Sequence, residues 1–403
     1  MMEQPTLSIS VRSHVAALLL IATGAGVAVY GMYAAPQRTW PNLLLDSFYC
    51  TSLALSAALF LATQRLTGAR WSASLRRVPE AFMMGLPAAA VMMLMLSFGC
   101  GILYPWARNP VSLPAIAGEA RYLAPTWVLV RAICVFLLWL TLAWLMRKTS
   151  LDQDRNLGSS LILDRHLNRY SAIFVLVFAA TFSVSAFDWV ISLEPHWFST
   201  MFAFYVFAGT FVQGIAGITL AAVMLKEQGA PGNVVRDNQL RDLGKMVFAF
   251  ATFWAYIWTC QYLLIWYGDI PDEVTHYAIR TNEHWIGLFI LNLLINWLVP
   301  FVCLMSARSK SSVTTLKIVS VVLLIGHWLD LYLLIMPAFF RVPQFGAPEL
   351  AIAIAYGAVL YLLFVRNLAK APLVPVHDPV LLAEALTSRV LATWAEEEEG
   401  WSA

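Results

Sequence analysis

The sequence predicts an all-α integral membrane protein with about ten transmembrane helices, and three observations favour this fold class. The 403 residues are 60% hydrophobic and only 12% charged, whereas a soluble domain is about 25% charged. The hydrophobic residues occur in runs of about 20, the length that an α-helix needs to cross the hydrocarbon core of a bilayer. Alternating segments of about ten residues, typical of a transmembrane β-barrel, do not occur.

The apolar runs divide the chain into a polar N-terminus (1–14), one ten-helix transmembrane domain (15–366) and a polar C-terminal tail (367–403). The first run follows a short polar segment that lacks a convincing signal-peptide cleavage pattern, so we expect a retained helix. The third run is rich in methionine and alanine, and the tenth is short. We predict spans at approximately 15–33, 43–62, 80–100, 124–146, 170–192, 197–225, 246–267, 285–306, 315–337 and 350–366.

The C-terminal tail contains one further amphipathic stretch. Residues 379–395 place several apolar side chains near one face of a possible helix, and the acidic run Glu396–Glu399 follows it. Two interpretations stay open: an interfacial or frayed tail, and a helix that docks onto a partner. The apolar side chains are Val380, Leu381, Ala385, Leu386 and Leu391.

Basic residues are distributed unevenly over the two sets of connections between spans. Of the 26 lysines and arginines, 20 lie on one set of alternate connections, Arg131 lies within a span, and five lie on the other set. The positive-inside rule places the richer side, together with both termini, in the cytoplasm. The net charge of +2 therefore reflects topology, and we expect no nucleic-acid partner. The five outer basic residues are Arg38, Arg108, Arg121, Arg280 and Arg341.

The sequence contains no pattern for a bound redox cofactor. No two of the five cysteines are spaced as CxxC, no CxxCH motif for covalent haem occurs, and no Walker or dinucleotide-binding fingerprint is found. His327 is the one histidine expected deep in a span, whereas a b-type haem would need histidines on two facing helices. We therefore expect no haem, iron–sulfur cluster or metal, and no catalytic residue. The cysteines are Cys50, Cys100, Cys134, Cys260 and Cys303.

Five ionisable residues lie inside apolar runs, and they are our candidates for proton transfer. A charge in the middle of a membrane helix costs roughly 2.5–3.5 kcal/mol on insertion scales, so such a residue indicates function by default. His327 and Asp330 are three residues apart, which places them on one helix face where a proton can be exchanged. The alternatives are contact with a quinone and a polar clamp that fixes helix packing. The five residues are Asp46, Arg131, Asp188, His327 and Asp330.

A second set of polar residues is expected near the outer ends of the spans. These residues are candidates for a mouth at the periplasmic face or for contact with a quinone. An interfacial aromatic belt and ordinary helix termination by glycine and proline explain the same segments structurally. The candidates are Glu194, His196, Gln261, Tyr262, Asp269 and His284.

Three separated motifs bring a known family into the interpretation. They are Phe187–Asp188–Trp189 with Ser192–Trp197, then Gln261–Trp266, then Trp328–Tyr332 with Met336–Pro337. Between about residues 40 and 366, the sequence resembles the ActF-type subunits of bacterial alternative complex III. These subunits belong to the wider NrfD/PsrC-like membrane family, and the complex is a quinol:cytochrome c, or high-potential acceptor, oxidoreductase.

The resemblance implies two four-helix bundles, at about 43–192 and 197–337, with the first and last spans peripheral. It implies a multi-pass protein of the bacterial cytoplasmic membrane. The implied partners are a second NrfD-like membrane subunit, an iron–sulfur/molybdopterin-like periplasmic subunit, haem c subunits and, in some assemblies, a terminal oxidase.

Three hypotheses about function follow. The chain is a cofactor-free subunit of a quinol-oxidising complex, in which buried carboxylates and a histidine transfer protons or support assembly. Alternatively, it has its own quinol pocket near the periplasmic face, where a carboxylate or histidine accepts the proton that the quinol releases. The third hypothesis is a stand-alone proton-coupled secondary transporter. Such transporters often have inverted repeats, and we find no convincing repeat in this sequence.

Overall fold

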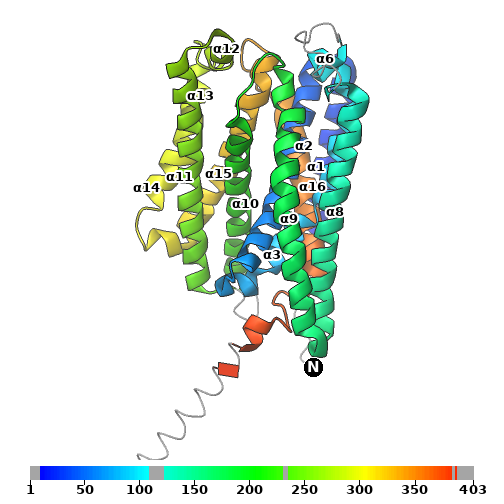
Figure 1. Ribbon diagram of the computed structural model, residues 1–403, viewed down its shortest axis with the longest axis vertical. Helices are drawn as coiled ribbons and strands as arrows, with labels where there is room; N and C mark the ends of the chain where they lie inside the picture. Colours follow the sequence, from blue (N-terminus) through cyan, green and yellow to red (C-terminus); the bar gives the residue numbers. More distant parts are fainter. Residues whose placement is uncertain (1–9, 109–121, 230–234, 384–385, 388–403) are drawn as a thin grey trace, which may run out of the picture.

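The computed structural model describes residues 10–108, 122–229, 235–383 and 386–387, and these form a bundle of long helices (Figure 1). No β-strand occurs among them. In the part of the chain that the structure describes, ten helical segments are long and apolar enough to cross a membrane, which confirms the predicted all-α character and the number of candidate spans.

Most of the predicted spans coincide with one continuous helix, and two are divided into shorter pieces. Short 3₁₀ segments occur at several helix ends. The α-helices are α1 (Val11–Ala34), α2 (Pro36–Leu66), α3 (Arg77–Met83), α4 (Leu86–Met95), α5 (Cys100–Leu103), α6 (Pro105–Arg108), α8 (Pro125–Arg155), α9 (Ser160–Trp189), α10 (Phe202–Glu227), α11 (Asp237–Gly268), α12 (Pro271–Arg280), α13 (Ile286–Leu293), α14 (Val299–Cys303), α15 (Val313–Ile335) and α16 (Ala347–Ala369).

Two boundaries differ from the prediction for identifiable reasons. Helices α8 and α9 continue through most of the polar connection 147–169, where charged side chains pair with neighbouring helices: Arg147 with Glu80 of α3, and Asp164 with Arg65 of α2. Helix α10 begins at Phe202 rather than at 197. Trp197 lies instead in the preceding turn, where its indole Nε1 donates to the carbonyl of Glu273 at 2.9 Å.

The third and eighth spans are interrupted. In the third span, α3 and α4 are separated at Met84–Gly85, just before Pro87, which has no N–H to continue the helical hydrogen bonds. In the eighth span, a π-helical segment, η6 (Leu294–Leu298), joins α13 to α14 shortly before Pro300. Such π-segments are frequent at functional sites because they change the direction of nearby side chains.

Helices α2 and α10 form the centre of the molecule. Their most apolar windows are 94% and 89% buried, whereas those of α1 and α16 are only 17% and 22% buried. A Cβ atom at Gly214 of α10 would lie 1.8 Å from Ser56 Oγ of α2, so the glycine permits this close approach. Helices α3–α5 and α9 pack against α2, and α8 packs against α9 and α4. Helices α11 and α15 pack against α10, α13 packs against α15, and α14 packs against α11 and α15. Helices α1 and α16 pair at the periphery.

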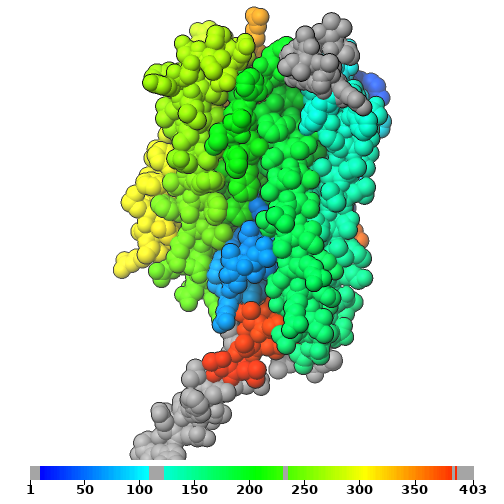
Figure 2. All heavy atoms as spheres, viewed as in Figure 1, coloured from blue at the N-terminus to red at the C-terminus, as the bar shows by residue number. Residues whose placement is uncertain are grey.

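The two ends of the bundle differ. We call the end with α6 and α12 the α12 end, and the opposite end, where Ser10 and the C-terminal segment (371–383) lie, the tail end (Figure 1). The C-terminal segment folds back below α3 and α9 (Figure 2), and Ala371, Leu373 and Asp378 are buried there. The predicted helix 379–395 is described only at Pro379–Ala383 and 386–387, and the rest lies outside the described residues.

Candidate functional site

A buried carboxylate lies at the centre of helices α10, α11, α13 and α15. Each of these four helices contributes one residue to the site around it. Asp330 of α15 is 4% exposed. Its Oδ1 accepts hydrogen bonds from the Tyr205 hydroxyl of α10 and, at 2.7 Å, from Asn292 Nδ2 of α13. Its Oδ2 accepts from the indole Nε1 of Trp254, on α11, at 3.2 Å. All three donors are neutral, so the Asp330 centre provides hydrogen bonds without a full positive charge.

His327 is the titratable neighbour of this centre. Its Nδ1 lies 3.9 Å from Asp330 Oδ2, an approach too long for a hydrogen bond. Both ring nitrogens are buried and have no hydrogen-bond partner among the described residues. The imidazole instead stands edge-on to Trp254, with ring centroids 5.6 Å apart. The expected proximity of His327 and Asp330 is confirmed, and a small movement of the ring would bring a proton within reach of the carboxylate.

The interrupted eighth span supplies a polar extension of the centre. Asn296 lies within the π-helical segment, and its Nδ2 donates to Asn292 Oδ1 at 2.6 Å and to the Gly326 carbonyl at 3.0 Å. A side chain at Gly326 would collide with Asn296, because a Cβ there would lie 2.3 Å from Asn296 Oδ1. Sequence reasoning missed both asparagines. The signal was two amides four residues apart in an otherwise apolar run, which places them on one helix face.

Arg131 and Asp188 form a closed ion pair near the α12 end. Arg131 Nε donates to Asp188 Oδ2 at 2.8 Å, and Nη2 donates to Oδ1 at 2.9 Å. Arg131 also donates to the Tyr122 carbonyl and lies 3.8 Å above the Tyr122 ring. Asp188 is 2% exposed, so a bidentate arginine is the partner that a buried carboxylate requires. Asp188 is therefore the carboxylate that neutralises Arg131.

Asp46 of α2 is also buried, but its carboxylate has fewer polar partners than that of Asp188. Its Oδ1 accepts a hydrogen bond from the indole Nε1 of Trp328 at 2.8 Å, whereas its Oδ2 has no partner among the described residues. Asp46 is 2% exposed and no ion pair joins it to a described cation. It therefore resembles Asp330 in its neutral surroundings and differs from Asp188.

A second charged cluster at the α12 end joins Glu194 to two residues of α12. Glu194 Oε2 lies 2.9 Å from His276 Nδ1, and Arg280 Nη2 donates to Glu194 Oε1 at 2.7 Å. Arg280 also donates to the carbonyls of Leu333 and Leu334, at 2.7 and 2.9 Å, which are among the last carbonyls of α15. A cation at a helix C-terminus is favourable, so the cluster fixes the end of the helix that carries Asp330.

Sequence reasoning predicted Glu194 but missed His276 and Arg280. The signal was their i,i+4 spacing, which places them on one face of a short helix that begins at Pro271. Burial and the charge of Arg280 lower the pKa of His276 to about 4, against the opposing effect of Glu194. Although burial alone would raise it, the charges of Arg280 and His276 hold the pKa of Glu194 well below its usual value.

These shifts predict a loss of stability in mild acid. The unfolded chain protonates His276 near pH 6.5 and the folded chain only near pH 4, so the unfolded state binds more protons between these values. The contribution of His276 to stability is therefore fully present above pH 6.5. The free energy of unfolding falls by about 1.4 kcal/mol per pH unit between pH 6.5 and pH 4. Thermal unfolding in detergent should show this slope. His276→Gln should reduce it and His284→Gln, at an exposed position, should not; equal slopes in all three proteins would contradict the assignment.

The remaining outer-mouth candidates do not gather into one site. His196 and Asp269 are exposed, and His284 is an exposed neighbour of Glu283. Gln261 is buried, and its Oε1 has no hydrogen-bond partner among the described residues. Tyr262 belongs to a row of aromatic rings that runs from Trp254 beside Asp330 to His276, with neighbouring centroids 5.1–6.2 Å apart. The row is Trp254, Trp258, Tyr262, Tyr277 and His276.

The tail end contains a buried network of charges. Glu80 is fully buried and accepts hydrogen bonds from Arg77 Nη1 at 2.6 Å, from Arg147 and from Ser150. Arg77 also pairs with Asp154. Sequence reasoning used these arginines only for orientation, although Arg77 and Glu80 at i,i+3 before an apolar run indicated a pair.

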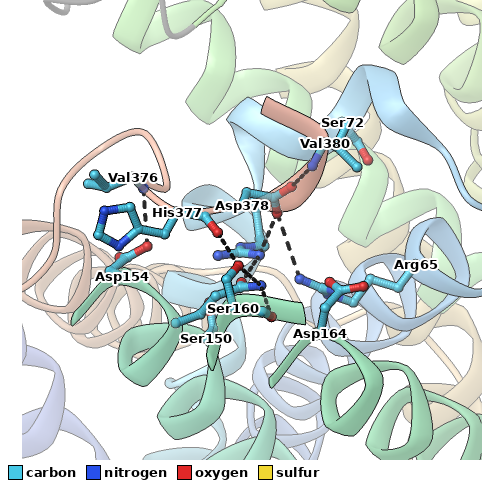
Figure 3. Close-up of polar contacts among 12 residues, drawn as sticks. Arg65, Ser72, Ser150, Asp154, Ser160, Asp164, Val376, His377, Asp378 and Val380 are labelled. Carbon is cyan, nitrogen blue, oxygen red and sulfur yellow. Dashed lines mark hydrogen bonds and ion pairs between the residues drawn. The ribbon is translucent and has the colours of Figure 1, made fainter. Parts of the chain in front are cut away.

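The C-terminal segment contributes to the same end. Figure 3 shows Asp378 near Arg65, and Arg65 Nη2 lies 3.9 Å from Asp378 Oδ2. Asp378 Oδ2 accepts from Arg76 Nη1 at 2.7 Å, and Ser160 Oγ donates to the His377 carbonyl at 2.6 Å. The Val376 N–H donates to Asp154 Oδ1 at 3.1 Å. The segment is therefore tied to α3, α8 and α9 by its own polar groups.

Fold and buried polar centres together define a multi-pass helical membrane protein. No protein-family model matches the chain, and no match is found among curated proteins. In the part of the chain that the structure describes, no three histidine, cysteine, aspartate or glutamate side chains gather as a metal site.

Proposed function

We propose that this chain is a cofactor-free integral membrane subunit of a respiratory quinol:cytochrome c, or high-potential acceptor, oxidoreductase of the alternative complex III type. In this proposal it lies in the bacterial cytoplasmic membrane, with the tail end in the cytoplasm and the α12 end at the periplasmic face. The observation that supports the proton-transfer role is the Asp330 centre, a buried carboxylate whose hydrogen-bond donors in the described part of the chain are all neutral. Beside it lies His327, whose ring nitrogens have no hydrogen-bond partner among the same residues. An intramembrane carboxylate of this kind is typical of proton relays.

The motifs that resemble the ActF-type subunits support the assignment to such a complex. The first contributes Asp188, Glu194 and Trp197, and the third contributes Trp328 and Asp330. All five side chains take part in the polar contacts described above. Two of the three motifs therefore include residues with polar roles in the structure, beside apolar residues that any membrane helix can contain.

The buried ionisable residues have different roles in this proposal. Asp330 and His327 transfer protons, and Asp46, which also lacks a cationic partner, is a second protonation site. Asp188 is held in a bidentate pair by Arg131, so it supports assembly. Electrons pass through the partner subunits: a second NrfD-like membrane subunit, an iron–sulfur/molybdopterin-like subunit and haem c subunits, with a terminal oxidase in some assemblies.

A quinol pocket in this chain itself is the second candidate, and one cavity favours it. A cavity of about 620 Å³ at the α12 end is lined by His196 and Asp272 among apolar residues such as Phe187, Ile191 and Phe198. An apolar cavity with an exposed imidazole suits a quinol headgroup that must give up a proton. A photoreactive quinol analogue that labels peptides around His196 would support this candidate, and labelling confined to the sister subunit would exclude it.

Purification of the tagged chain in a mild detergent tests the proposal directly. We expect haem c and iron–sulfur subunits to co-purify in a fixed ratio, identified by mass spectrometry, and to be absent when an unrelated multi-pass protein carries the same tag. That result would also exclude the stand-alone transporter. Recovery of the chain alone would contradict the proposal.

A further inference from the structure

A cavity of about 270 Å³ opens at the tail end between α2, α3, α9 and the C-terminal segment. This volume is far above the minimum of about 15 Å³ that a single water molecule requires. Its polar lining includes three arginines and two aspartates, and apolar side chains such as Phe60, Leu61 and Pro79 complete the wall. The charged lining residues are Arg65, Arg70, Arg76, Asp164 and Asp378.

Arg76 is the residue that indicates a ligand. It is 3% exposed and lines the cavity. Nη1 donates to Asp378 and, at 3.1 Å, to Gln153, whereas Nη2 has no hydrogen-bond partner among the described residues. Its Nε lies 3.4 Å from Glu80 Oε1 as an ion pair without a hydrogen bond. A buried guanidinium donor without an acceptor is costly, so an acceptor from outside the chain would be favourable.

Positive charge exceeds negative charge on the cavity wall. Both aspartates are already paired: Arg65 Nη1 lies 2.9 Å from Asp164, and Asp378 lies 2.7 Å from Arg76 Nη1 and 3.9 Å from Arg65 Nη2. Arg70, exposed at the rim, adds a third guanidinium. Buried Arg65 Nε also has no hydrogen-bond partner in the described part of the chain. Burial and the positive charge of Arg65 lower the pKa of Arg76 to about 10, which is consistent with an excess of positive charge here.

We infer that this cavity binds a phosphate-type oxyanion, and that the headgroup of an anionic phospholipid is the source that its position favours. Arginine forks match phosphate oxygens in geometry and charge. The cavity lies at the ends of membrane-spanning helices, and its apolar wall suits the start of an acyl chain. Basic pockets between transmembrane helices at the membrane surface bind anionic headgroups in this way. The inference does not depend on the respiratory role proposed above.

Native mass spectrometry of the full-length chain in detergent tests the inference. The probes are phosphatidylglycerol and phosphatidylcholine with identical acyl chains. We expect phosphatidylglycerol to bind about tenfold more tightly, and Arg70→Gln to weaken it about fivefold, the effect of one basic residue near a lipid surface. Arg155→Gln is the matched control, because Arg155 is 75% exposed at the same end and lies outside the cavity. Equal weakening by both variants would overturn the inference.

Two further measurements complete the test. Asp378→Asn removes a negative charge from the wall, so it should strengthen phosphatidylglycerol binding about fivefold, an increase that a misfolded variant cannot produce. Weaker binding by this variant would contradict the site. Titration with inorganic phosphate distinguishes the sources: displacement of phosphatidylglycerol indicates a headgroup site, whereas phosphate binding without preference between the two lipids indicates a free anion in the same cavity. If the chain showed no preference between the two lipids and did not bind phosphate, the inferred anion site would be refuted.

Discussion

Replacement of Glu80 by glutamine is expected to destabilise the chain by about 3–5 kcal/mol. Glu80 is the acceptor shared by Arg77, Arg147 and Ser150 inside the tail end, and none of its surface is exposed. Glutamine has nearly the same shape but no charge, so it would leave two buried guanidiniums with less compensation. Removal of one partner from a buried ion pair has this large cost because the remaining charge stays desolvated.

The free energy of unfolding in mixed detergent–SDS micelles measures this effect. The matched control is Asp152→Asn, which also neutralises a carboxylate at the tail end. Asp152 lies 3.8 Å from Arg155 in an exposed pair, so we expect a change below about 1 kcal/mol. If Glu80→Gln and Asp152→Asn differed by less than the experimental error, the buried network would not contribute to stability as described.

Loss of the ion pair between Arg131 and Asp188 is expected to have the second large effect on stability. Asp188→Asn and Arg131→Gln are each expected to destabilise by about 3 kcal/mol, because each leaves one charge of a bidentate pair without its partner. The Arg131 side chain is 23% exposed and that of Asp188 only 3%, so Asp188→Asn, which leaves the partly solvated guanidinium unpaired, should cost the less of the two. The double variant removes both charges, and its loss should be smaller than the sum of the single losses by about 1–3 kcal/mol.

This double-mutant cycle also separates structure from proton transfer at Asp188. If the double variant recovers stability and the complex retains its proton movement, Asp188 acts through its pairing with Arg131. Additive losses would show that the two side chains do not interact as the distances indicate. Ser183→Ala on α9 serves as the control, since its exposed hydroxyl bonds only to the Ala179 carbonyl of its own helix.

The ten spans could be predicted from the sequence because the bilayer constrains each of them locally. A run of about 20 apolar residues needs no knowledge of its neighbours to be recognised as a span. The same logic found Asp46, Asp188 and Asp330, since a carboxylate in an apolar run is anomalous by itself. The helix α10 start at 197 was wrong because Trp197, although apolar, is held in a turn by a contact with Glu273 76 residues away.

Pairing between helices could not be predicted in this way. Arg131 and Asp188 are 57 residues apart, and Glu194 and Arg280 are 86 apart, so no local pattern joins them. Asn292 of α13 donates to Asp330 of α15, 38 residues away in the sequence. The charged tail-end residues were interpreted as topology signals because a lysine or arginine near a span end is ordinarily solvated.

Proton release and quinol oxidation, measured together in complexes with Asp330→Asn, test the central claim most directly. The variant keeps the size of the side chain but removes its ability to take up a proton. We expect assembly and quinol oxidation close to wild type and proton movement reduced at least tenfold. Ser320→Ala, a buried position on α15 whose hydroxyl has no hydrogen-bond partner among the described residues, should leave both rates unchanged. Normal proton movement in a fully assembled Asp330→Asn complex would contradict the account.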